Sequence, residues 1–195
     1  MKDLNQLNLG TLTALSRTVD AKSSWTAGHS ERVTQYALAV GKAMELNASD
    51  LETLQRAALL HDIGKIGVSA DILDKTGKLD DVEFREIQTH SRMGARILEP
   101  IGSYSDAIPI ILQHHERHDG TGYPYGLIGG SILIGARIIA VCDVFDALTN
   151  DRPYRKAWSR EKVIDLIKEE SGKKFAPKVV DLFLSAVVFA EETQQ

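Results

Sequence analysis

Several histidines and aspartates of this sequence are spaced in a way that is typical of a metal site. The chain has six histidines, at positions 29, 61, 90, 114, 115 and 118, and most stand beside glycine, aspartate or glutamate. The run His61-Asp62-Ile63-Gly64-Lys65 ends an apolar helical segment. Adjacent residues within a helix point in different directions, but at a helix end they can converge on a pocket between helices. Asp143 lies within the apolar segment 132–148, where an unpaired carboxylate is costly and needs a cation or a hydrogen-bond partner.

Each of these residues also has an ordinary structural explanation when taken alone. His29 is compatible with a helix-start residue, and the pair His61-Asp62 is compatible with a helix cap. The adjacent pair His114-His115, directly before a glycine-rich segment, has little structural use. The metal-site prediction therefore rests on the whole set of residues.

Together, seven side chains predict a dinuclear metal site. They offer imidazole nitrogens and two carboxylates from separate elements, and Asp62 has two oxygens with which to bridge two first-row divalent ions. The set is His29, His61, Asp62, His90, His114, His115 and Asp143. Two metals about 3.5–4 Å apart lower the pKa of a shared water to about 7 and hold a phosphoryl oxygen for in-line attack. Lys65, one turn after His61, is expected to hold a phosphate beside them, so the predicted reaction is phosphoester hydrolysis.

The composition is that of one ordinary globular domain. With 195 residues, 43% hydrophobic and 26% charged, the chain can bury a core without staples. The formal net charge of -4 argues against nucleic-acid binding through bulk positive charge, so an anionic ligand must be attracted locally. The single cysteine, Cys142, lies in an apolar run and is expected to be core. We expect a cytoplasmic protein, because no run approaches a transmembrane length and the polar start is unlike a signal peptide.

Helical periodicity recurs along the whole chain and predicts an all-α fold, a bundle of about seven to eight helices. A long loop with five glycines and Pro124 interrupts it at 116–130. The helix expected at 4–20 begins without a clear cap. We therefore expect residues 1–25 to form a lead-in helix that continues from an upstream sensor, and residues 26–195 to form the enzymatic domain. Dimerisation through the lead-in helix is left open. The other helices are expected at 30–46, 50–61, 80–98, 105–115, 132–148, 160–169 and 177–191, with one brief turn at 71–73.

Several motifs together resemble the HD-GYP subgroup of the HD metal-dependent phosphohydrolases. The resemblance extends from about Thr26 to the C-terminal helices. The motifs are His61-Asp62-Ile63-Gly64-Lys65, the isolated His90, His114-His115-Glu116-Arg117-His118-Asp119-Gly120-Thr121-Gly122-Tyr123-Pro124, and Asp143-Val144-Phe145-Asp146-Ala147-Leu148 with Arg152-Pro153-Tyr154-Arg155.

The resemblance implies a phosphodiesterase that opens cyclic di-GMP to linear pGpG and in many members carries it on to GMP. It implies that Lys65 lies near the scissile phosphate. Its glycine loop would border the substrate at Gly122, Tyr123 and Pro124 and contact diguanylate cyclase (GGDEF) domains, and its phosphate clamp would be Arg152 and Arg155. One metal would be held by His29, His61, Asp62 and Asp143, and the other by Asp62, His90, His114 and His115.

The resemblance leaves three matters open. Some members have a glutamate four residues before the first ligand histidine that binds a third metal, but this chain has Trp25 there, so two ions are expected. Iron or manganese suits the donors best, although imidazole also accepts zinc, cobalt or nickel. The substrate is alternatively another cyclic dinucleotide such as cyclic GMP-AMP, or the domain is a signalling module that binds a dinucleotide or partner and turns over little.

Overall fold

The computed structural model describes residues 2–23, 26–152 and 155–188, with the side chains of α1 described from Leu9 onward. Trp25, the centre of the Arg152–Arg155 motif and the end of the last expected helix lie outside these residues. Within them the chain has nine α-helices and no β-strand, which confirms the all-α prediction. The helices are α1 Lys2–Asp20, α2 His29–Ala43, α3 Ala48–Leu60, α4 Ala70–Leu73, α5 Asp81–Leu98, α6 Ile108–Gln113, α7 Ile134–Thr149, α8 Arg160–Glu169 and α9 Pro177–Phe183. Four short elements join or extend them, namely η1 Ile63–Gly67, η2 Gly102–Tyr104, η3 Gly129–Ser131 and the π-helical η4 Leu184–Val188.

Two helix starts follow directly from the sequence. The Asn47 side chain accepts a hydrogen bond from the backbone N–H of Asp50 at 3.0 Å and so caps α3. Asp80 and Glu83 form a reciprocal capping box at the start of α5. Helix α3 leads into His61 and α5 contains His90, so these caps help to fix the positions of two candidate metal ligands.

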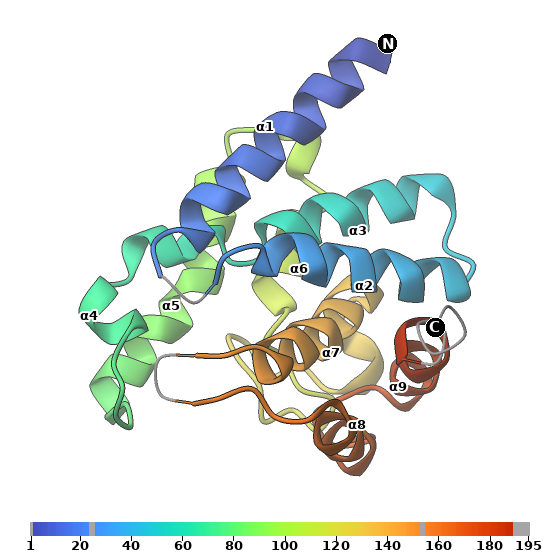
Figure 1. The fold of residues 1–195 in the computed structure, drawn as a ribbon. Helices are drawn as coiled ribbons and strands as arrows, with labels where there is room; N and C mark the ends of the chain where they lie inside the picture. Colours follow the sequence, from blue (N-terminus) through green and yellow to red (C-terminus); the bar gives the residue numbers. More distant parts are fainter. Residues whose placement is uncertain (1, 24–25, 153–154, 189–195) are drawn as a thin grey trace.

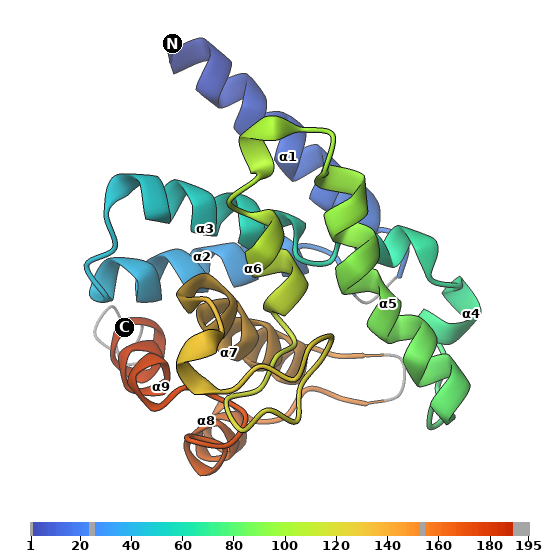
Figure 2. The same ribbon diagram turned by 180° about the vertical axis from the view of Figure 1, so that it is seen from behind.

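Helices α2, α3 and α7 form the centre of the bundle (Figure 1). Helix α5 packs against η1 and α6 on one side, whereas α8 and α9 pack on α7 on the other (Figure 2). The C-terminal half of α1 packs on α2, α3 and η1, and its N-terminal end projects beyond the other helices. Among the described residues, no helix combines the length and apolar character needed to cross a membrane.

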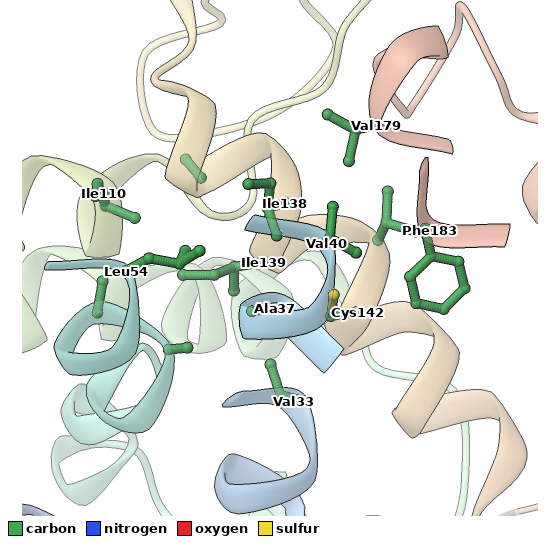
Figure 3. Close-up of a cluster of buried hydrophobic side chains, with 14 of the residues drawn as sticks. Val33, Ala37, Val40, Leu54, Ile110, Ile138, Ile139, Cys142, Val179 and Phe183 are labelled. Carbon is green, nitrogen blue, oxygen red and sulfur yellow. The ribbon is translucent and has the colours of Figure 1, made fainter. Parts of the chain in front are cut away.

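The core lies where the central helices meet. Figure 3 shows Val33 and Val40 of α2 facing Ile138 and Cys142 of α7, and Phe183 of α9 closes one end. All five side chains are fully buried, so Cys142 is the core residue that the sequence predicts. This apolar contact fixes α2 and α7 side by side. It thereby places the first residue of α2, His29, near Asp143 of α7, and both are metal-binding candidates.

Candidate metal centre

All seven predicted metal-binding residues come together at one end of the bundle. Five segments supply them: the start of α2, the turn between α3 and η1, the middle of α5, the end of α6 and the middle of α7. They fall into two groups in which the possible ligand atoms lie within 4.8 Å of one another. One group is His29, His61 and Asp143, and the other is Asp62, His90, His114 and His115.

Asp62 lies between the two groups. Its Oδ2 atom is 3.7 Å from Nε2 of His29 and 3.5 Å from Nε2 of His61. Its Oδ1 atom is 3.5 Å from Nε2 of His90, on the other side. The two carboxylate oxygens therefore face different groups of histidines, which is the arrangement a bridging ligand requires.

Backbone hydrogen bonds fix the orientation of three of the histidine rings. The Nδ1 atoms of His61, His90 and His114 lie 2.6–2.8 Å from the carbonyl oxygens three residues earlier in their own helices. A carbonyl only accepts, so each Nδ1 must carry the proton and each Nε2 keeps a free lone pair. These lone pairs converge on Asp62, and Nε2 of His90 lies 3.2 Å from Nε2 of His114.

Burial and neighbouring charges shift the pKa values of the side chains in the cluster. Burial lowers the pKa of His115 to about 3 and that of His114 well below its ordinary value, so both imidazoles are neutral. Burial opposes charge on Asp62, but the Lys65 ammonium and the nearby imidazoles keep its pKa well below the usual range. Burial also lowers the pKa of His29, but the hydrogen bonds that its ring donates to the carboxylates of Asp143 and Asp146 raise it to about 9. The site therefore needs a positive charge beside these carboxylates, either a proton on His29 or a cation.

The donor set fits a divalent metal. Nε2 of His61 is buried and has no hydrogen-bond partner among the described residues, which is costly unless a cation accepts its lone pair. Neutral imidazoles with two ionised carboxylates suit first-row divalent ions. His61 is fully buried and Asp143 is only 17% exposed, so water cannot satisfy the cluster freely.

Lys65 lies beside the cluster, as the sequence predicts. Its Nζ atom donates to Oδ2 of Asp62 at 2.5 Å. The turn that carries it packs tightly on α5, because a Cβ atom on Gly64 would lie 1.9 Å from the carbonyl oxygen of His90. Only glycine fits at this position, so the glycine of the motif sets the distance between Asp62 and α5.

The glycine loop returns to the histidines through the predicted residues Gly122, Tyr123 and Pro124. The ring of Tyr123 lies 4.8 Å from the ring of His115, and the Tyr123 N–H donates to the His115 carbonyl at 3.2 Å. A Cβ on Gly122 would lie 2.3 Å from the backbone N of Arg117, so the close approach requires glycine. The Tyr123–Pro124 peptide bond is cis. A cavity of about 110 Å³ opens here, lined in part by His114, His115, Tyr123 and Asp143.

The two arginines of the expected phosphate clamp, Arg152 and Arg155, pair with each other through their backbones. Arg152 and Arg155 form an isolated β-bridge, with backbone hydrogen bonds of 2.8 and 3.0 Å in both directions. The Arg155 guanidinium donates to the carbonyl oxygens of Ala147 and Leu148 at 2.7 and 3.1 Å, so it caps the last turn of α7. The phosphate-clamp role stays a prediction.

Sequence reasoning missed Asp146 and Arg32, which support His29 from behind. Asp146 is fully buried, and its Oδ2 atom lies 2.6 Å from Nδ1 of His29. Arg32 donates to the same carboxylate at 2.6 and 3.0 Å. The carboxylate fixes the proton of His29 on Nδ1 and turns Nε2 toward Asp143, 3.2 Å away. The sequence did contain a signal for Asp146, because a second aspartate three residues after Asp143 in an apolar helix also needs a buried partner.

Comparison with known proteins places this geometry in a family. The sequence profile of the HD domain family matches residues 13–179. The 3'3'-cGAMP-specific phosphodiesterase 3 of Vibrio cholerae is 46% identical over 81% of this chain and 34% of its own length. The cyclic di-GMP phosphodiesterase PA4108 of Pseudomonas aeruginosa is 42% identical over 89% of this chain and 42% of its own length. A crystal structure of a cyclic GMP-AMP specific phosphodiesterase from V. cholerae is 37% identical, with a TM-score of 0.57, and the match covers 91% of this chain and 40% of that chain.

The chain belongs to the HD domain family, within its HD-GYP subgroup. Membership together with the histidine–aspartate cluster identifies a protein that binds divalent metal. The chain spans about a third to two fifths of the length of these two curated relatives.

Proposed function

We propose that this domain is a metal-dependent phosphodiesterase that hydrolyses cyclic di-GMP to pGpG and then to GMP. The observation that carries the proposal is the position of Asp62, whose two oxygens face two separate groups of buried histidines. Such a site holds two cations on one carboxylate and presents an open side toward the glycine loop. Two adjacent cations would stabilise the negative charge on the phosphoryl oxygens of a phosphodiester during its hydrolysis.

In this proposal the ligands divide as the two groups do. His29, His61 and Asp143 would hold one ion and His90, His114 and His115 the other, and Asp62 would contribute an oxygen to each. The donors suit iron or manganese. When bound, two such ions supply an acidified water and a positive field for the phosphoryl oxygens. Trp25 stands in the sequence where some members carry a glutamate for a third metal, and an indole cannot coordinate a cation, so the proposal has two ions.

The chain's own residues bind and orient the substrate. Lys65 donates to Asp62 in this structure, and its 24% exposed side chain can turn the same ammonium toward a phosphate oxygen. Tyr123 packs on His115 at the edge of the cavity and offers a ring face to a base. The cavity beside it is too small for a whole dinucleotide, so one phosphate enters while the bases lie along the loop. Arg152 is the candidate for the second phosphate, on the resemblance to the phosphate clamp.

A second substrate deserves equal testing, because the 46% identical relative is named as specific for 3'3'-cGAMP. The experiment incubates the manganese- or iron-loaded domain with cyclic di-GMP, 3'3'-cGAMP and cyclic di-AMP separately and resolves the products by chromatography. The proposal expects cyclic di-GMP to give pGpG and GMP at the highest kcat/KM. A higher kcat/KM for 3'3'-cGAMP would make that dinucleotide the preferred substrate and leave the proposed reaction unchanged. No turnover of any of the three dinucleotides would overturn the proposed phosphodiesterase activity.

We also propose that the glycine loop is a docking surface for diguanylate cyclase domains. Tyr125 and Ile128 on this loop are 56% and 64% exposed, which is unusual for large apolar side chains. Replacing both by serine should abolish binding to a purified cyclase domain while hydrolysis continues. If binding survives His61→Ala with Asp62→Ala but hydrolysis does not, the domain also works as a signalling module.

The remaining proposals concern residues 1–25. We propose that this stretch is a lead-in helix from an upstream sensor, and that two copies of it pair in a homodimer. Exposed Leu9 and Leu15 on α1, at 40% and 43%, are the surface available for pairing. Sedimentation of the chain with and without Leu15→Glu tests this: a dimer that dissociates in the variant supports it, and a monomer at all concentrations contradicts it.

A further inference from the structure

Lys22, two residues after the end of α1, contacts the turn that carries the catalytic candidates Asp62 and Lys65. The Nζ atom of Lys22 donates hydrogen bonds to the carbonyl oxygens of Lys65 at 3.0 Å and Ile66 at 2.7 Å, and to that of Val68. An ammonium has three donors, and here all three are used on one short backbone segment. These carbonyls lie at the end of η1, where the last carbonyls of a helix commonly lack partners within it. The Lys65 carbonyl also accepts from the Val68 N–H at 3.1 Å.

The turn is held from the opposite side by α5. Gly64 lies against the backbone of His90 and Gly94 so closely that no side chain fits between them. Element η1 therefore lies between a tight backbone contact on α5 and the Lys22 ammonium from α1. Its position decides how far Asp62 lies from His90 and how Lys65 approaches Asp62.

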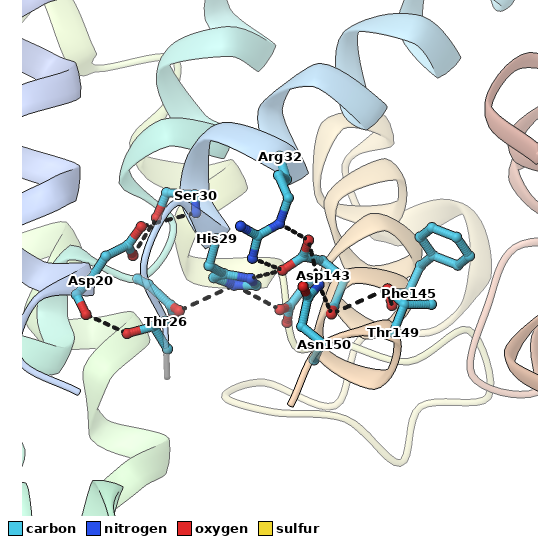
Figure 4. Close-up of polar contacts among 12 residues, drawn as sticks. Asp20, Thr26, His29, Ser30, Arg32, Asp143, Phe145, Thr149 and Asn150 are labelled. Atoms are coloured by element: carbon cyan, nitrogen blue, oxygen red, sulfur yellow. Dashed lines mark hydrogen bonds and ion pairs between the residues drawn. The ribbon is translucent and has the colours of Figure 1, made fainter. Parts of the chain in front are cut away.

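The same end of α1 also fixes the first residue of α2. The Asp20 carboxylate accepts hydrogen bonds from the N–H of Ser30 at 3.2 Å and from its hydroxyl at 2.9 Å (Figure 4). The N–H of His29 donates to the carbonyl of Thr26 at 2.9 Å, and the Thr26 hydroxyl donates to the carbonyl of Asp20 at the short distance of 2.5 Å. The end of α1 thus contacts both the His29 segment and the Asp62 turn.

We infer that Lys22 is a positioning residue for the Asp62–Lys65 turn, and that through it α1 sets the geometry of the metal centre. This inference rests on the proposed function for its activity readout. It extends that function, because it connects the element that leads into the domain with the residues that do the chemistry. A displacement of α1 would pull the three carbonyls and move Asp62 relative to the histidines of α5 and α6.

The test replaces Lys22 by methionine, which keeps the length of the side chain and removes its donors. Lys42→Met is the matched control, because Lys42 is exposed in the last turn of α2, far along the chain from η1. Both proteins and the parent are compared for Mn²⁺ affinity by calorimetry, for kcat and KM, for Tm without metal, and for hydrogen exchange of the amides in 63–68.

Removing a group that orients metal ligands typically costs about 10–100-fold in metal affinity or activity. We expect Lys22→Met to lose Mn²⁺ affinity and kcat within this range, with KM within twofold, and to exchange the amides of 63–68 faster in the metal-free protein. Lys42→Met should match the parent in every readout. Lys22→Gln, which keeps one donor, should fall between the parent and Lys22→Met.

Two results would overturn the inference. One is unchanged exchange in 63–68 together with parental Mn²⁺ affinity in Lys22→Met. The other is a lower Tm with parental affinity and kcat, which would make Lys22 a stabilising contact only. If the parent itself neither binds Mn²⁺ nor hydrolyses a dinucleotide, the proposed function fails instead, and the exchange measurement still decides whether Lys22 holds the turn.

Discussion

The Nδ1 atom of His29 and the Oδ2 atom of Asp146 lie 2.6 Å apart in a fully buried contact between α2 and α7. Arg32 holds the same carboxylate from the next turn of α2. The pair connects the first residue of α2 to the last turn of α7. It also leaves Nε2 of His29 directed at the metal site.

Asp146→Asn should weaken metal binding without touching a ligand. The amide removes the negative charge that stabilises the Nδ1 proton of His29, and leaves Arg32 without its ionised partner. We expect Mn²⁺ affinity to fall about 10–100-fold, measured by calorimetry. Asp181→Asn, at an exposed position of α9, is the control and should leave affinity unchanged. Parental affinity in Asp146→Asn would show that His29 is oriented by other contacts.

Two glycine-to-alanine changes should act in opposite directions on stability. Gly64→Ala places a Cβ 1.9 Å from the His90 carbonyl, so η1 and α5 must separate, at a cost of about 1–3 kcal/mol or more in the free energy of unfolding. Gly10→Ala in α1 meets nothing within 4 Å and should raise stability by about 0.5–1 kcal/mol. Urea unfolding of the metal-free proteins measures both. Equal stability of the two variants would contradict the tight packing of the turn.

The two arginines of the β-bridge should give different phenotypes. Arg155→Ala removes the donors to the carbonyls of Ala147 and Leu148 and should lower Tm. Arg152→Ala should leave Tm unchanged and raise KM for the dinucleotide, because only backbone contacts of Arg152 are found among the described residues. Thermal melts and initial rates distinguish them. A KM that is unchanged in Arg152→Ala would remove this residue from the phosphate clamp.

Metal should stabilise the folded domain. A ligand that binds only the folded state at a hundred times its Kd adds about 2.7 kcal/mol, which corresponds to a rise in Tm of about 5–10 °C for a chain of this size. Adding Mn²⁺ should produce this rise, and a chelator should reverse it. His61→Ala removes a buried ligand candidate and should show a smaller rise than the parent; an equal rise would place the ion elsewhere.

The sequence predicts the helices and the seven metal-binding candidates well, because both depend on local patterns. Helix starts at Asn47 and Asp80 follow from capping chemistry, and a carboxylate within an apolar run, such as Asp143, indicates a buried cation site. Helix ends are less exact: α6 is expected at 105–115 but runs from Ile108 to Gln113. The division of the chain at residue 26 remains a prediction.

Contacts between distant segments are what the sequence does not predict. The Lys22 ammonium meets carbonyls more than forty residues away, and Asp146 meets His29 across 117 residues. Lys22 has no local pattern that distinguishes it from an ordinary charged side chain. Asp146 stands out as an aspartate in an apolar helix, but its position alone does not identify His29 as its partner. The β-bridge between Arg152 and Arg155 is likewise not predicted by their spacing in the sequence.

The most direct test of the central claim combines metal analysis with turnover. The chain is purified without oxygen, its metal content is determined, and its products from cyclic di-GMP are separated, with Asp62→Ala treated in the same way. The account predicts about two ions of iron or manganese per chain and the appearance of pGpG or GMP, and it predicts that Asp62→Ala loses both. Full turnover by Asp62→Ala, or a parent protein that binds no stoichiometric metal, would contradict it.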